Sequence, residues 1–199
     1  MWKSTTLNMA GASHTHDVYQ QHDINNCGPS SIIMTVNQGL KKSVSIGFAQ
    51  TLVGQIEKAG GKRTGAQADA RWHAWGDSSL GGYSDMDDLC TAIKKKWPGL
   101  NATTATGTSS HQDLLQAATP SSPVLAHVAW IGGGGHFIVC LGKNAANQMV
   151  WLDPYNGVVV NDYHGDATED AVYYNTAQNS FGKSAAQAWS WHGIYTTPA

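Results

Sequence analysis

Charged residues, cysteines and long apolar runs are all scarce in this chain of 199 residues. Asp, Glu, Lys and Arg make up 13% of it, against roughly 25% in typical soluble domains. With 12 basic and 14 acidic residues and a formal net charge of −2, the sequence offers no strongly basic surface for nucleic acid. Its one basic run, Lys94-Lys95-Lys96, ends a predicted helix, where positive charge interacts favourably with the helix dipole.

Three cysteines are too few for a disulfide scaffold. The sequence also lacks the run of about eighteen apolar residues that a membrane-spanning helix needs, so no membrane span is predicted. The first residues, Met1 to Asn8, lack the apolar core of a signal peptide. If the chain is excised from a larger protein, its targeting signal would lie in another part of that protein. Low charge is more common outside the cytosol, which favours secretion or delivery into the cytoplasm of a target cell.

Histidines gather near the N-terminus without the spacing of a metal site. His14, His16 and Asp17 lie together and His22 follows, in a stretch rich in Ser and Thr. No Cys-x-x-Cys pair and no His-Glu-x-x-His helix accompanies them, so we predict a polar segment and no metal. The glycines at 132–135 precede a predicted strand and lack the Lys-Ser/Thr of a phosphate loop. No cofactor is predicted.

The most informative stretch that is present is Gln-His-Asp-Ile-Asn-Asn-Cys-Gly-Pro-Ser-Ser, from Gln21 to Ser31. It puts Cys27 in the first turn of a predicted helix, where unpaired N–H groups and the helix dipole favour the nucleophilic thiolate over the thiol. Gln21, upstream of it, carries an amide that can donate to an oxyanion forming beside the sulfur. The stretch therefore predicts a nucleophile and an oxyanion donor.

A base and a group to orient it follow further along the chain. His136 begins the apolar run His-Phe-Ile-Val-Cys-Leu, which is too short for a long helix and indicates a buried strand. Asp153 ends a second predicted strand. Two neighbouring antiparallel strands with this connection would bring His136 and Asp153 side by side, so that the carboxylate selects one imidazole tautomer and supports its cation.

Each of these residues also has a purely structural interpretation. Free cysteine is among the most buried residue types, and an Asp-Pro pair at a strand end is most often a turn. For Cys27 and Asp153, the complete set favours the catalytic interpretation. Cys90, in the helical stripe Met86-Leu89-Cys90-Ile93-Trp97, and Cys140, within a predicted strand, are expected in the core.

Three short motifs occur in order between residues 20 and 160: Gln-x5-Cys-Gly-Pro, Gly-His-Phe-Ile-Val and Leu-Asp-Pro-x-x-Gly. The ordered set resembles the papain-like cysteine peptidases, and within them the bacteriocin-processing branch, whose domains cut after double-glycine leader sequences. The resemblance implies a catalytic triad of Cys27, His136 and Asp153, with Gln21 completing the oxyanion hole. Since no transporter segments follow, the chain is expected to act as a free-standing enzyme.

The order of the predicted elements favours an α+β fold. Residues 1–20 are expected to form a mobile N-terminal arm, and residues 21–199 a single papain-like domain. Helices first and strands second agrees with two lobes, a helical N-terminal lobe that carries the nucleophile and a C-terminal antiparallel sheet that carries the histidine and aspartate. The Trp-rich segment 62–83 is expected to be a loop that flanks the cleft. Predicted helices cover 27–38, 45–58, 85–96 and 111–118, and predicted strands cover 124–130, 136–141, 148–152, 157–160, 170–175 and 192–196.

Three functions are compatible with this set of residues. The first is a cysteine endopeptidase that cuts a protein or peptide after small residues such as Gly-Gly, as a bacterial effector or toxin restrained by an inhibitor or immunity protein. The second is a transglutaminase or glutamine deamidase, since these enzymes use Cys, His and Asp in the same order. The third is a catalytically silent binding module, against which the complete Gln-Cys-His-Asp set argues.

Overall fold

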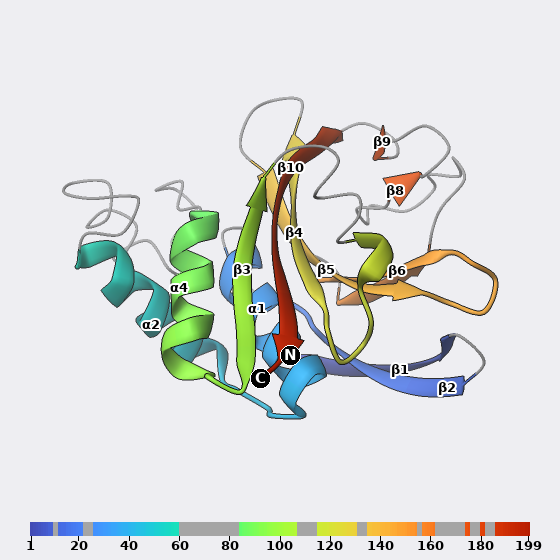
Figure 1. The fold of residues 1–199 in the computed structure, drawn as a ribbon, viewed down its shortest axis with the longest axis horizontal. Coiled ribbons are helices and arrows are strands. Elements are labelled where there is room, and N and C mark those ends of the chain that lie inside the picture. The colour runs from blue at the N-terminus through green and yellow to red at the C-terminus, as the bar shows by residue number, and fades with distance from the viewer. Residues whose placement is uncertain are drawn as a thin grey trace.

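Helices and antiparallel strands make up the computed structural model of the chain (Figure 1), and the predicted α+β class is confirmed. The model describes residues 1–9, 12–21, 26–59, 84–106, 115–130, 135–154, 157–161, 174–175, 180–181 and 186–199. The helices are α1 (Cys27–Leu40), α2 (Ile46–Lys58) and α4 (Met86–Lys96). The strands are β1 (Trp2–Met9), β2 (Ala12–Tyr19), β3 (Leu100–Thr106), β4 (Val124–Trp130), β5 (Gly135–Lys143), β6 (Met149–Asp153), β7 (Val158–Asn161), β8 (Tyr174–Asn175), β9 (Ser180–Phe181) and β10 (Ala186–Pro198).

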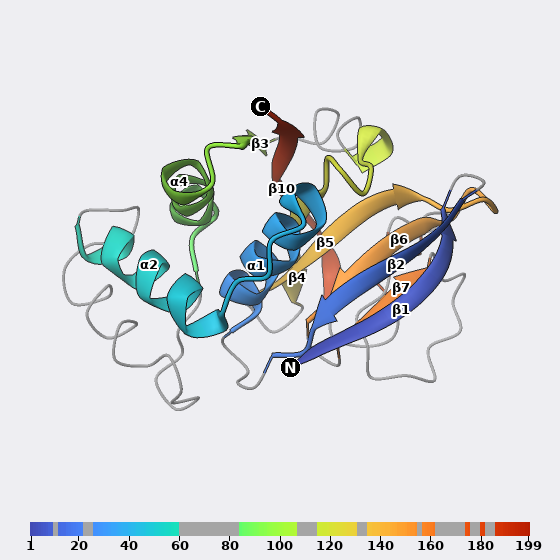
Figure 2. The same ribbon diagram turned by 90° about the horizontal axis from the view of Figure 1, so that it is seen from below.

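Six of the strands form one antiparallel sheet in the order β3-β10-β4-β5-β6-β7. The helix α1 lies against β5, and α4 packs on β3 near the opposite end of the sheet from β7 (Figures 1 and 2). The hairpin of β1 and β2 lies beside β6 and β7. In the described part of the chain, no helix combines the length and apolar character needed to cross a membrane.

The helix α1 is buried on all its faces over its first turns, from Cys27 to Val36. Ile32 and Val36 join an apolar cluster with side chains of α2, α4 and β3, whereas Ile33 and Met34 join a second cluster with side chains of β2, β5 and β6. Since interiors are close-packed, contacts from both clusters fix the position of α1 against the sheet. The first residue of this helix is therefore held firmly relative to β5.

The end of α1 differs from the prediction, which placed it before Gly39. The helix continues to Leu40, and the chain leaves it through Lys41 in the left-handed conformation, at φ 55°, whose N–H donates to the Asn37 carbonyl. Gly39 serves packing instead, because a Cβ built there would lie 2.7 Å from Leu100 Cδ2. The glycine allows β3 to approach the helix closely.

The start of α4 is also one residue later than expected. A helix that begins at residue 85 would have Ser84 as its N-cap, but Asp85 is the N-cap, and its side chain accepts a 2.9 Å hydrogen bond from the Asp87 N–H. Ser84 instead packs against α1, where a Cβ on Gly28 would lie 2.6 Å from its hydroxyl oxygen. The start of α4 thus lies against the first turn of α1.

Residues 1–20 differ from the arm that composition suggested. β1 and β2 pair from Trp2↔Tyr19 to Met9↔Ala12, and the side chains of Met9, Val18 and Tyr19 are buried in the core. Strand pairing satisfies the backbone of this polar segment, and a few apolar side chains anchor it. The division of the chain at residue 20, with one papain-like domain after it, stays a prediction.

The predicted strands near 124–130, 136–141, 148–152 and 157–160 correspond to β4, β5, β6 and β7. The last predicted strand, 192–196, lies within the longer β10, and β3 was not predicted. Half of the predicted helix at 111–118, most of the predicted strand at 170–175 and the whole of the Trp-rich segment 62–83 lie outside the described residues. Of the parts that are described, residues 115–117 are helical and residues 174–175 form β8. The division into two papain-like lobes stays a prediction.

Candidate active site

Cys27 is the first residue of α1 and is 6% exposed. The preceding residue, Asn26, does not cap the helix with its side chain; its Oδ1 accepts a 2.9 Å hydrogen bond from Gln50 Nε2 of α2. The first-turn N–H groups of α1 are therefore not occupied by a capping side chain from Asn26. They contribute the positive end of the helix dipole beside the Cys27 sulfur.

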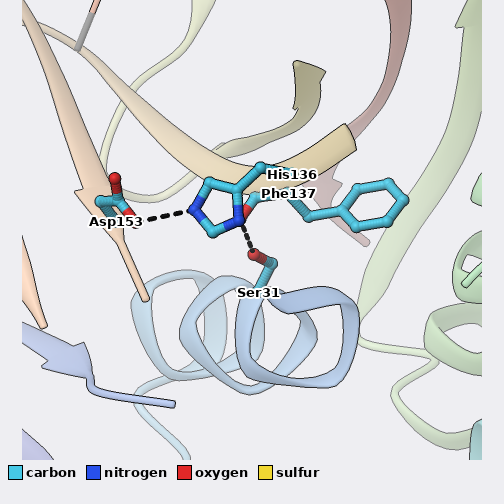
Figure 3. Close-up of polar contacts among 4 residues, drawn as sticks. All are labelled: Ser31, His136, Phe137 and Asp153. Atoms are coloured by element: carbon cyan, nitrogen blue, oxygen red, sulfur yellow. Dashed lines mark hydrogen bonds and ion pairs between the residues drawn. The ribbon is translucent and has the colours of Figure 1, made fainter. Parts of the chain in front are cut away.

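His136 and Asp153 lie side by side, as the sequence predicted. The Nε2 atom of His136 is 2.8 Å from Asp153 Oδ1 (Figure 3). The strand register explains the contact: β5 and β6 pair at Val139↔Leu152, so the start of β5 lies beside the end of β6. Both side chains are almost fully buried, which strengthens the attraction between them.

Two opposing effects act on the pKa of His136. Burial lowers it, whereas the negative charge of Asp153 and the hydrogen bond to it raise it, and Cys27 adds a smaller effect in the same direction. The net result raises the pKa of His136 from 6.5 to about 10. The ring is therefore an imidazolium at neutral pH, held by the buried carboxylate.

Cys27 acts on the same imidazole, because its side chain raises the pKa of His136 through hydrogen bonding and charge. In Figure 3 one ring nitrogen points to Asp153, and the other is turned toward α1. An imidazolium in this position donates to both neighbours, to the carboxylate through Nε2 and to the sulfur through Nδ1. A histidine beside a cysteine is the arrangement in which an adjacent base can activate a thiol as a nucleophile.

A second bond joins the two elements that carry Cys27 and His136. The hydroxyl of Ser31 donates a 3.0 Å hydrogen bond to the carbonyl oxygen of Phe137 (Figure 3). Ser31 lies one helical turn after Cys27, and Phe137 directly follows His136, so the bond runs parallel to the cysteine–histidine contact. Sequence reasoning missed Ser31, although its spacing of four residues from Cys27 places both on one helix face.

Gln21 is buried, at 8% exposed. Its backbone N–H donates a 2.7 Å hydrogen bond to the carbonyl of Pro154, the residue after Asp153. The structure thus brings Gln21 to the turn that follows the aspartate. Residues 22–25, between Gln21 and the start of α1, lie outside the described part of the chain, and its role as an oxyanion donor stays a prediction.

The other two cysteines lie in the core, as predicted. All three cysteines are free, and Cys90 and Cys140 are buried. Burial raises the pKa of the Cys90 thiol, and it raises that of Cys140 to about 12. Both groups therefore stay protonated at neutral pH and are poor nucleophiles.

The N-terminal histidines give no support for a metal site. His16 is buried, and its Nδ1 lies 3.3 Å from Gln38 Oε1 of α1, an interaction that ties β2 to the helix. Among the residues that the structure describes, no group of three or more His, Cys, Asp or Glu side chains is arranged to hold a metal ion. His22 is not among the described residues.

Comparison with known proteins agrees with this arrangement. A search of curated proteins finds no match. The model of the Peptidase C39-like family matches residues 14–181, a range that includes Cys27, His136 and Asp153. Since the match covers most of the chain, the protein belongs to the Peptidase C39-like family of papain-like cysteine peptidases.

Proposed function

We propose that this cysteine peptidase uses Cys27 as nucleophile, His136 as acid and base, and Asp153 to orient and charge His136. The observation that supports the proposal most is that one buried imidazole contacts both other residues, with Asp153 Oδ1 2.8 Å from Nε2 and Cys27 bonded to the same ring. The first turn of α1, which the Asn26 side chain does not cap, adds a field that favours a negative sulfur. Nucleophile, base and orienting group thus have the mutual contacts that covalent catalysis needs.

The reaction begins with attack of the Cys27 thiolate on the carbonyl carbon of the scissile peptide bond. The carbonyl electrons move to oxygen, and we assign this oxyanion to the Cys27 N–H and the Gln21 side-chain amide. As the C–N bond breaks, the imidazolium of His136 gives its proton to the leaving amine. Water then loses a proton to His136 and attacks the thioester, which releases the carboxylic acid and restores the thiolate.

The substrate we propose is a protein or peptide with small residues before the scissile bond, such as Gly-Gly. This specificity rests on the motif resemblance to peptidases of the double-glycine leader type. Growth arrest of bacteria that depends on Cys27, and that a partner protein relieves, would be the sign of an effector or toxin with an immunity protein.

The test is mass spectrometry of a bacterial proteome treated with the purified protein. We expect new peptide termini after small residues, and none with Cys27→Ala, which should fold normally because the change removes only a sulfur. Gln21→Ala should cut at the same places but roughly 10²–10³ times more slowly. Side-chain mass gains of about one unit without new termini would assign the site to a glutamine deamidase instead, and full activity of Cys27→Ala would overturn the proposal.

A further inference from the structure

The residues that precede the proposed nucleophile are fastened to the turn that follows the aspartate. Gln21 donates its N–H to the Pro154 carbonyl at 2.7 Å. The neighbouring Gln20 packs on Gly157, the residue directly before β7. The hairpin that ends at Gln20 lies along β6 and β7 in Figure 2, so these contacts extend a larger interface.

Gly157 has no room for a side chain. A Cβ built on it would lie 2.7 Å from Gln20 Cβ, closer than real Cβ contacts come, and 3.2 Å from Gln20 Cα, tighter than most of them. The backbone there has φ +63°, a conformation that glycine adopts without penalty and alanine does not. Glycine is therefore favoured at position 157 for two reasons, the close approach of Gln20 and the positive φ. Only the first of them involves Gln20.

If a side chain at 157 forces the two segments apart, we expect Gln20 and Gln21 to shift more than the start of β7. The turn is anchored on its other flank by the pairs Leu152↔Val159 and Asp153↔Val158, and by the bond of Asp153 to His136. Gln20 lies beyond the last residue of β2 and is bonded through its backbone to Met1 of the neighbouring strand end. A side chain at 157 would therefore lift the segment that carries Gln21 and leave Asp153 in place.

We propose that Gly157 is a positioning residue for the oxyanion donor, because it lets Gln20 pack on the β6–β7 turn and so sets the place of Gln21. The inference rests on the proposed function, since it takes Gln21 to be that donor. It predicts that the oxyanion site is sensitive to a residue far along the chain, whereas the cysteine–histidine pair is not.

The test needs no known substrate. Alkylation of Cys27 by iodoacetamide, followed at that residue by mass spectrometry, reports on the thiolate and its base. The aldehyde acetyl-glycyl-glycinal should protect Cys27 from this alkylation. The degree of protection reports on the oxyanion site, because addition of the thiolate to the aldehyde creates an oxyanion. We expect Gly157→Ala and Gln21→Ala each to weaken protection by about tenfold or more, and the double variant to be no worse than Gln21→Ala. Alkylation without aldehyde, and its pH profile, should be unchanged in Gly157→Ala.

Two further variants separate the contact with Gln20 from backbone strain. Asn147→Ala puts alanine at φ 62° in the turn between β5 and β6, and should leave protection unchanged. Gly157→Asn carries a Cβ but tolerates positive φ better than alanine, so it should fold well and still weaken protection. If Gly157→Ala fails to fold, Gly157→Asn carries the test.

The inference is overturned if Gly157→Asn protects like the unchanged protein, or if Gly157→Ala shifts the pH profile of alkylation as Asp153→Asn does. Unchanged protection in Gln21→Ala would also overturn it, while leaving the thiolate and its base intact. Failure of the proposed function looks different: Cys27 would then react with iodoacetamide no faster than the buried Cys140.

Discussion

At the scale of single residues, the buried pair of His136 and Asp153 controls how this protein responds to pH. Both side chains are almost fully buried, so each charge is stabilised by the other, and Cys27 adds to the stabilisation of the His136 cation. Removing one charge from such a pair leaves the other buried and uncompensated, which is strongly unfavourable. The pair should therefore affect both catalysis and the free energy of unfolding.

We predict that His136 loses its stabilising effect on the fold as the pH rises above neutral. The folded pKa of His136 is raised to about 10 from 6.5, so its contribution is complete below pH 6.5 and is lost as the pH rises through about 10. Urea unfolding is measured from pH 6 to 10 in Cys27→Ala, so that the contribution of His136 is observed without that of the Cys27 thiol. The free energy of unfolding should fall more steeply with pH in Cys27→Ala than in Cys27→Ala/His136→Gln. Equal slopes would contradict the positive charge assigned to His136.

Ser31 and Ser30 offer a matched comparison on α1. Ser31→Ala should destabilise the protein by about 1–3 kcal/mol, because it leaves the buried Phe137 carbonyl without its donor. Among the described residues, the equally buried Ser30 hydroxyl has no hydrogen-bond partner, so Ser30→Ala should cost little or stabilise. Urea denaturation of both variants checks this, and a larger loss for Ser30→Ala would contradict the structure.

The sequence was most informative at this scale. Cys27, His136 and Asp153 could be selected because each lies in a short, recognisable motif and the three motifs occur in order along the chain. Ser31 could not, because serine is common and its acceptor is a backbone carbonyl more than a hundred residues away. The same applies to Gly157, whose contact with Gln20 is visible only once β2 lies beside β6 and β7.

At the scale of elements, helices and strands were predicted more reliably than their ends. The apolar patterns of α1 and α4 and the β-branched runs of β4 to β7 predicted those elements from local sequence. The ends of the helices depend on residues of other elements instead. Leu100 packs closely on Gly39 inside α1, and Ser84 packs closely on Gly28 and does not cap α4. The local rules for caps contain no information on such neighbours.

The cap of α4 gives a direct test at this scale. Asp85→Ala should lower the free energy of unfolding by about 1 kcal/mol, because the Asp87 N–H loses its acceptor. Asp85→Asn keeps an acceptor oxygen and should cost much less. Thermal and urea unfolding measure both, and equal losses would mean that charge and not capping is what Asp85 contributes.

At the scale of the whole molecule, the N-terminal hairpin is part of the core. Its strands β1 and β2 are rich in Ser, Thr and His and show little alternation of apolar residues, which is why the sequence did not predict them. β3, with the sequence Leu-Asn-Ala-Thr-Thr-Ala-Thr, was missed for the same reason. Such polar strands depend on pairing with partners that come from distant parts of the chain.

We predict that the hairpin and the remainder of the chain unfold together. Val18 is fully buried in the cluster shared with α1, β5 and β6, so Val18→Ala should cost about 2 kcal/mol and lower the single melting transition. Thr103→Ala, at an exposed position on β3, should stay within about 0.5 kcal/mol. Calorimetry distinguishes the outcomes, since a separate early transition in Val18→Ala would show that the hairpin folds independently.

The place of β10 has a consequence for how this protein is made. The strand β10 inserts between the edge strand β3 and β4, and its Ile194 belongs to the same apolar cluster as Cys27. While the ribosome is still adding residues near 190, β3 and β4 have no strand between them, and that cluster is incomplete. Since domains fold as units, we expect the nascent polypeptide to carry Cys27, His136 and Asp153 before this cluster is complete, and to bring the three residues together only after β10 has been made.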